Sequence, residues 1–294
     1  MRVTDSMIFD RANAGTARAR SALDAAVEEN SSGLRVQHPW DDPGAAGQLT
    51  SANLAADRYT AIGQAAGKAS DELQAADGAL GEVQNLVARA RELAVQLSNG
   101  SYGAADRSAA AAEVDALIPQ VIAQLNTKFG GRYLFGGNKD GADPFDAAGN
   151  YLGDTAVRQV EIAPGVLEAA SVRADVAIKG VGGGTDVLAA LQSLSAALKA
   201  NNVAGVQGTL TTLAQGTEQI STARSGLGGS MAAFDAAVAA TRSAHDREQT
   251  RVSHLADADP VESASKLALA QRALEASITA AAQGFQLTLL DKLK

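Results

Sequence analysis

The sequence predicts a mainly α protein: an elongated, antiparallel rod of coiled-coil helices with a small β-rich insert. Hydrophobic residues make up 46% of the chain but aromatic residues only 4%, so alanine supplies much of the apolar surface, and alanine suits closely packed long helices. Two long stretches place apolar residues at alternating steps of three and four, the spacing of a coiled coil. These stretches mirror each other around a glycine-rich centre, which brings the two termini together at one end of the rod.

The N-terminal unit is predicted at residues 1–40. Most of it has the pattern of a weakly amphipathic helix, whose thin apolar stripe includes Leu23 and Val27. The segment QHPWDDPGAAG at 37–47 combines prolines, glycines and an aspartate pair. Such a combination ends one helix and starts another.

The N-terminal half of the rod, predicted at 41–130, contains the strongest pattern in the sequence. Apolar side chains fill the a and d positions of consecutive heptads without a slip, and a second helix with its own apolar side follows. The long seam consists of Tyr59, Ile62, Ala66, Ala69, Leu73, Ala76, Leu80, Val83, Val87, Ala90, Ala94 and Leu97, and the second helix presents Ala110, Val114, Leu117, Val121 and Leu125.

Residues 131–184 form the predicted β-rich insert. Glycines and aromatic residues concentrate there, and turns separate short segments with strand-like composition at 132–135, 157–162 and 171–178. The glycine-rich run at 180–184 lacks the lysine that a phosphate-binding loop requires. We therefore expect it to be a joint.

The C-terminal half of the rod is predicted at 185–259, with a short helix and then a long one from about residue 203 to 257. Polar residues at several seam positions predict partial exposure or local register defects. The seam passes through Leu213, Thr217, Ile220, Arg224, Leu227, Met231, Phe234, Val238, Thr241, His245, Glu248, Val252 and Leu255. The last unit, 260–294, is a helix with another thin apolar stripe.

Composition argues against several classes of function. A net charge of −8 does not suit a nucleic-acid-binding protein. The chain has no cysteine, and no apolar run approaches the roughly 20 residues that span a membrane. The N-terminus lacks the apolar core of a cleaved secretory signal. We find no nucleophile–base pair, metal-ligand cluster or cofactor motif, so no catalytic, cofactor-binding or metal-binding residue is predicted.

Asp41 and Asp42 are adjacent and point in different directions, which does not suit a pair of catalytic carboxylates. We expect them to cap the helix that follows, with Pro43 in its first turn. Together with Pro39, they would make the segment a spoke of fixed angle between the terminal helix and the rod.

Three blocks of the sequence resemble the flagellin superfamily. SSGLRV at 31–36 and DDPGAAG at 41–47 resemble the N-terminal block of flagellins and their junction relatives. GGRYLFGG at 130–137 looks like the motif that opens the variable region of hook–filament junction proteins. The C-terminal helix, ending in LLDKL at 289–293, is similar to the assembly helix of that family. Pro39 and Pro43 favour a junction protein over a filament flagellin.

This resemblance implies a flagellin-like, extracellular structural subunit of the bacterial flagellum and not an enzyme. It would be exported by the flagellar type III apparatus without a cleaved signal peptide and form an adaptor ring between hook and filament. The implied partners are further copies of the chain, a larger hook-associated protein on the hook side, flagellin on the filament side and an export chaperone. Cofactors, nucleic acid and membrane insertion are not implied.

Under this reading the terminal helices gain their burial from neighbouring subunits, because their own stripes are too thin. The expected self-assembly residues are Leu23, Val27, Leu34, Leu267, Leu274, Ile278, Phe285, Leu289 and Leu290, and the expected spoke and capping residues are Pro39, Asp41, Asp42 and Pro43. Alternatives are a minor flagellin of the filament, a soluble coiled-coil signalling or secretion-chaperone component, and an enzyme hidden in the insert.

Overall fold

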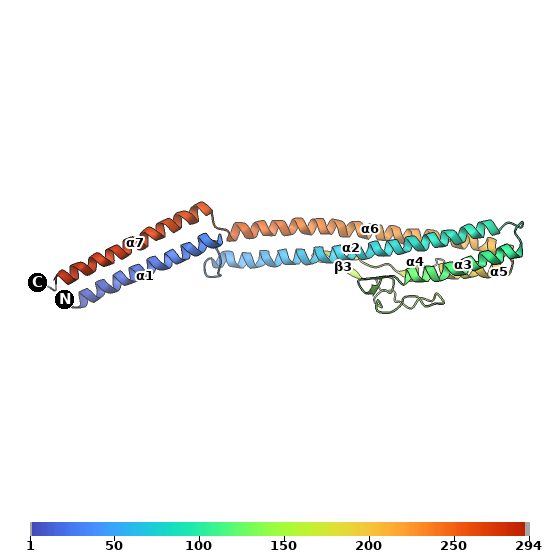
Figure 1. The fold of residues 1–294 in the computed structure, drawn as a ribbon, viewed down its shortest axis with the longest axis horizontal. Coiled ribbons are helices and arrows are strands. Elements are labelled where there is room, and N and C mark those ends of the chain that lie inside the picture. Colours follow the sequence, from blue (N-terminus) through green and yellow to red (C-terminus); the bar gives the residue numbers. More distant parts are fainter. Residues whose placement is uncertain (1, 292–294) are drawn as a thin grey trace. The chain divides into compact units, whose positions relative to one another are not determined.

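The structure, a computed structural model, describes the backbone of residues 2–291 and the side chains of residues 7 and 9–283. Within this range the protein is mainly α-helical, with only two small antiparallel strand pairs (Figure 1), so the predicted fold class is confirmed. The helices are α1 (Arg2–Ser32), α2 (Pro43–Leu97), α3 (Ala104–Leu125), α4 (Ala174–Ala177), α5 (Val187–Lys199), α6 (Val203–Ala256) and α7 (Pro260–Asp291), and the strands are β1 (Lys128–Phe129), β2 (Arg132–Tyr133), β3 (Gln159–Ala163) and β4 (Val166–Ala169).

The chain divides into two compact units. The first contains residues 1–57 and 244–294, and the second contains residues 58–243. Helices α2 and α6 contribute to both units, whereas α1 and α7 belong to the first and the β-rich insert belongs to the second. No helix of the described chain is both long and apolar enough to cross a membrane.

The second unit is built on the predicted seams. On α2, every seam position from Ile62 to Leu97 is buried and Tyr59 is half-buried. The predicted apolar side of α3 is also buried throughout. On α6, the buried apolar seam residues are Leu213, Ile220, Leu227 and Phe234.

Arg224, a polar residue on the α6 seam, forms an ion pair with α2. Its Nε and Nη2 donate to the two carboxylate oxygens of Asp77 at 2.8 and 3.0 Å, and its Nη1 donates to Gln84 at 2.9 Å. The Asp77 carboxylate raises the pKa of Arg224. Both hydrogen bonds form together only when the guanidinium and the carboxylate are aligned, so they are sensitive to the position of α6 along α2. A polar seam residue here therefore sets the register of α6 against α2 and is no register defect.

The insert differs from the sequence prediction in two segments. Strand β4 (Val166–Ala169) was not among the predicted strands. Residues 171–178, predicted as a strand, contain helix α4, because Ala174, Ala177 and Ile178 are buried at helical spacing. The Arg173 carbonyl accepts from the amides of Val176 and Ala177 at 3.1 and 2.9 Å. These backbone groups are thus satisfied locally and need no partner strand.

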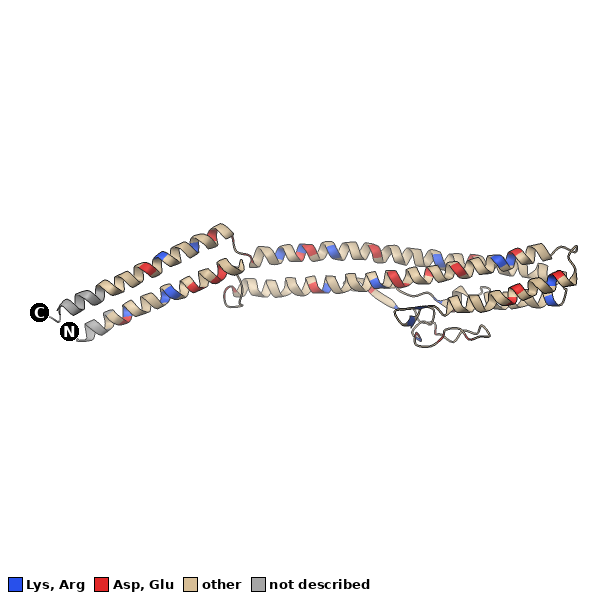
Figure 2. Cartoon of the chain, in the orientation of Figure 1, with Lys and Arg blue, Asp and Glu red and all other residues tan. Residues whose placement is uncertain are grey.

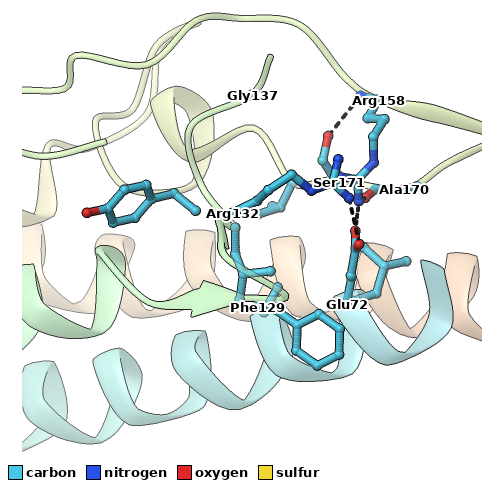
Figure 3. Close-up of a pocket in the computed structure, with 12 residues that line it drawn as sticks. Glu72, Phe129, Arg132, Gly137, Arg158, Ala170 and Ser171 are labelled. Atoms are coloured by element: carbon cyan, nitrogen blue, oxygen red, sulfur yellow. Dashed lines mark hydrogen bonds and ion pairs between the residues drawn. The ribbon is translucent and has the colours of Figure 1, made fainter. Parts of the chain in front are cut away.

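A buried carboxylate on α2 holds the insert (Figure 3). Glu72 is 5% exposed, and its two oxygens accept from Arg132 at 2.8 Å and from Arg158. Arg158 also donates to the Ala170 carbonyl at 2.9 Å. The cavity beside this cluster measures ≈ 10 Å³, room for about one water molecule and far too small for an organic substrate.

Candidate assembly site

Helices α1 and α7 pack against each other within the first unit. They run antiparallel, since the Lys266 ammonium near the start of α7 lies 3.1 Å from the Glu29 carboxylate near the end of α1. The pair has almost no core of its own. Among the described side chains of these two helices, only Ala26 and Ser263 are buried.

The structure does not gather the predicted self-assembly residues into a core. Leu23, Leu267 and Leu274 are half-buried. Val27, Leu34 and Ile278 are 48%, 36% and 52% exposed. Phe285, Leu289 and Leu290 lie outside the residues whose side chains are described.

A shallow groove of ≈ 360 Å³ lies where the first half of α1 meets the second half of α7. Phe9 lines it and remains 52% exposed. Sequence reasoning missed Phe9, although an aromatic residue in a chain with only 4% aromatics was a usable signal. The groove is lined by Phe9, Asn13, Thr16, Ile278, Ala281 and Ala282.

Asp42 occupies the cap position of α2. Its Oδ1 accepts from the Ala45 amide at 3.0 Å, and Pro43 is the first helical residue. Its Oδ2 accepts from Arg35 Nη1 at 3.2 Å. The amide of Ala45 and then the Arg35 guanidinium hold the pKa of Asp42 below its ordinary value.

Asp41 does not cap α2, contrary to the expectation for the pair. Its Oδ2 accepts from the amides of Gln37 and His38 at 3.0 and 2.8 Å, which lie before it in the chain. These two amide donors lower the pKa of Asp41. Adjacent side chains diverge, so only one of the two aspartates reaches the helix, and the other closes the turn that contains Pro39.

The segment between α1 and α2 is tied to the junction of α6 and α7. The amides of Arg35 and Val36 donate to the Ala256 carbonyl at 2.6 and 3.2 Å, and the Ala258 amide donates to the Gly33 carbonyl at 2.8 Å. The Arg35 side chain adds a bond of 2.9 Å to the Leu255 carbonyl. Sequence reasoning missed Arg35, whose partner lies far away in the chain.

The turn displays the chain's single tryptophan. Trp40 is 74% exposed, and its ring stacks on His38 with centroids 4.5 Å apart. Both acidic and basic residues occur along the helices, with no long segment of one sign (Figure 2). This site thus presents exposed apolar side chains, among them Phe9, Trp40 and Ile278.

Side chains of the protein itself bind the polar groups around the glycine-rich run at 180–184, where a phosphate-binding loop would bind its ligand. Gln219 of α6 accepts from the Thr185 amide at 2.8 Å and donates to the carbonyls of Ala177 and Thr185 at 3.0 and 3.1 Å. Lys179, the adjacent cation, forms an ion pair with Asp186. This arrangement serves as a joint before α5.

Comparisons with known proteins agree with this architecture. Residues 6–140 match the family described as the bacterial flagellin N-terminal helical region. Flagellar hook-associated protein 3 of Salmonella typhimurium is 30% identical over 155 residues, which cover 52% of this chain and 49% of that protein. The chain thus matches about half the length of this curated relative.

Two solved structures share the fold at low sequence identity. Flagellar hook-associated protein-3 from Legionella pneumophila has a TM-score of 0.61 at 16% identity and covers 70% of this chain and 98% of that one. The flagellar junction protein FlgL from the same organism has a TM-score of 0.51 at 16% identity and covers 61% and 96%. Residues 6–140 thus match the flagellin N-terminal helical region, and the fold of the chain is that of solved flagellar hook-associated and junction proteins.

Proposed function

We propose that this protein is a structural subunit of the bacterial flagellum that forms an adaptor ring between hook and filament. The observation that carries the proposal is the α1–α7 pair, two long helices that expose apolar side chains and have almost no core of their own. The names of its relatives, hook-associated protein 3 and flagellar junction protein, support the same role.

In this role the terminal helices bind neighbouring subunits. Each side chain of the size of Ile278 that becomes fully buried contributes about 1.5–3 kcal/mol. Burial of several such side chains along α1 and α7 would supply the free energy that holds neighbouring subunits together in a ring. Phe9 and Ile278 line the same groove. The half-buried Leu274 lies one helical turn before Ile278, and Phe285, Leu289 and Leu290 are the expected continuation of this surface.

The segment 37–47, together with residues 33–36 before it, acts as the spoke in this proposal. Asp42 caps α2, Asp41 closes the preceding turn, and backbone hydrogen bonds join the segment to the α6–α7 junction. Pro39 and Pro43 add stiffness. Such a connection would pass force between the terminal helices and α2 without bending of the segment.

The proposed partners are copies of this chain, flagellin on the filament side and a larger hook-associated protein on the hook side. The subunit reaches the cell exterior through the flagellar type III apparatus, with an export chaperone and without a cleaved signal peptide. It performs no catalysis.

Deletion of the gene tests the proposal. The expected cells have hooks but no filaments and release flagellin into the medium, and a plasmid copy restores filaments. Intact filaments in the deletion strain would favour a minor flagellin. Failure of the wild-type chain to leave complemented cells would favour a cytoplasmic coiled-coil role.

A further inference from the structure

The loop between α2 and α3 contains Asn99 followed by Gly100, both exposed. We propose that this pair is a site of spontaneous covalent modification, at which Asn99 converts to isoaspartate in the folded protein. Three features of the loop support the reaction: a backbone amide at Gly100 that is free within the described part of the chain, a polarised side-chain amide at Asn99, and the buried guanidinium of Arg107.

The nucleophile would be the amide nitrogen of Gly100. Within the described part of the chain, this amide donates to no hydrogen-bond acceptor. Glycine has no side chain to block its approach to the neighbouring Asn99 side chain. The attacking group is therefore both accessible and unengaged.

The electrophile would be the side-chain amide carbon of Asn99. Its Oδ1 accepts from the amide and from the hydroxyl of Ser101, each at 3.0 Å. The Ser101 amide can only donate a hydrogen bond, so the side-chain atom of Asn99 that faces it must be Oδ1 and not Nδ2. Two donors on this oxygen stabilise the negative charge that develops when nitrogen attacks the carbon.

The third feature is Arg107, which is 3% exposed on α3. Its guanidinium donates to the backbone carbonyl of Asn99 at 2.8 Å, to the Leu97 carbonyl at 3.2 Å and to Asn201 Oδ1 at 2.6 Å. No ion pair of the described residues includes Arg107. The buried Arg107 cation, whose hydrogen-bond partners here are all neutral, thus contacts the Asn99 carbonyl oxygen. In isoaspartate this oxygen belongs to a carboxylate, whose charge the guanidinium would stabilise.

The chemistry needs only water. The Gly100 nitrogen loses its proton and bonds to Asn99 Cγ; the C–N bond of the side-chain amide breaks, and ammonia leaves. This gives a five-membered imide. Water then adds to one imide carbonyl and the ring C–N bond breaks, which restores an amide N–H and releases a carboxylate. Attack at the backbone carbonyl, which Arg107 polarises, gives isoaspartate and sets the new carboxylate beside the guanidinium.

Incubation of the purified full-length chain in mildly alkaline buffer, followed by cleavage after glutamate residues and peptide mass spectrometry, tests this. The peptide 93–113 contains Asn99 as its only asparagine, both in the wild type and in variants at residues 100 and 107. We expect Asn99 to convert several-fold faster than Asn85, which lies within α2, and an isoaspartate-to-aspartate ratio higher in the folded chain than in the same chain unfolded in urea. Enzymatic methylation of isoaspartate provides an independent readout.

Gly100→Ala is the matched variant, because a Cβ at this position meets no atom within 4 Å. It should fold normally and slow conversion by at least several-fold, while Arg107→Gln should lower the isoaspartate fraction towards the urea value. Should Arg107→Gln fail to fold, the comparison of folded and urea-unfolded wild type still decides. Conversion at Asn99 no faster than at Asn85, or equal product ratios in both states, would overturn the proposal.

Discussion

Replacement of Glu72 should release the β-rich insert from α2. Removal of one partner from a fully buried ion pair costs about 3–5 kcal/mol. Here the side chains of Arg132 and Arg158 are 42% and 29% exposed, and Arg158 keeps its bond to Ala170, so part of that cost is screened. We expect Glu72→Ala to lower the free energy of unfolding by about 2–3 kcal/mol. Glu72→Gln, which keeps one acceptor, should cost about 1–2 kcal/mol.

Urea unfolding followed by circular dichroism measures these differences, and hydrogen exchange over residues 128–172 locates them. Glu82→Gln is the control, since Glu82 is exposed on the same helix and belongs to no ion pair of the described residues; it should change stability by less than about 0.5 kcal/mol. A double-mutant cycle with Arg158→Met should show coupling of at least about 0.5 kcal/mol. Equal stability of the two Gln variants, or no coupling, would show that Glu72 does not hold the insert.

Three further outcomes are expected. Gly63→Ala places a Cβ 2.9 Å from the buried Thr241 hydroxyl and should be less stable than Gly78→Ala, which meets no atom and should gain about 0.5–1 kcal/mol; equal melting temperatures would contradict this. The pKa of Asp42 is lower in the folded protein than its ordinary value of 3.8, so ionised Asp42 stabilises the folded state above that pH. The stability advantage of wild type over Asp42→Asn should therefore shrink as the pH falls below 3.8; a pH-independent difference would count against this. Leu274→Asp should leave the second unit's melting unchanged and abolish filament attachment in complemented cells, whereas normal filaments would remove α7 from the proposed assembly surface.

The helical organisation was largely predictable, because it depends on local spacing. The α2 seam from Ile62 to Leu97 follows from a period that the chain carries by itself. The start of α2 at Pro43 follows from cap chemistry. Fold class therefore needed no knowledge of distant contacts.

The contacts of particular polar groups were not predictable. Arg35 binds the Leu255 carbonyl, and Glu72 binds two arginines of the insert; each partner lies far away in sequence. The difference between Asp42, which caps α2, and Asp41, which does not, depends on side-chain direction within a turn. Residues 171–178 have a strand-like composition, but the burial of Ala174 and Ala177 favours a helical turn.

The position of the protein in the flagellum tests the central proposal most directly. An epitope on an exposed loop of the functional chain, labelled with gold and viewed by electron microscopy, would locate it on intact flagella. We expect a single band of label where hook and filament meet. Label along the filament, or its absence from flagella that contain hook and filament, would contradict the junction role.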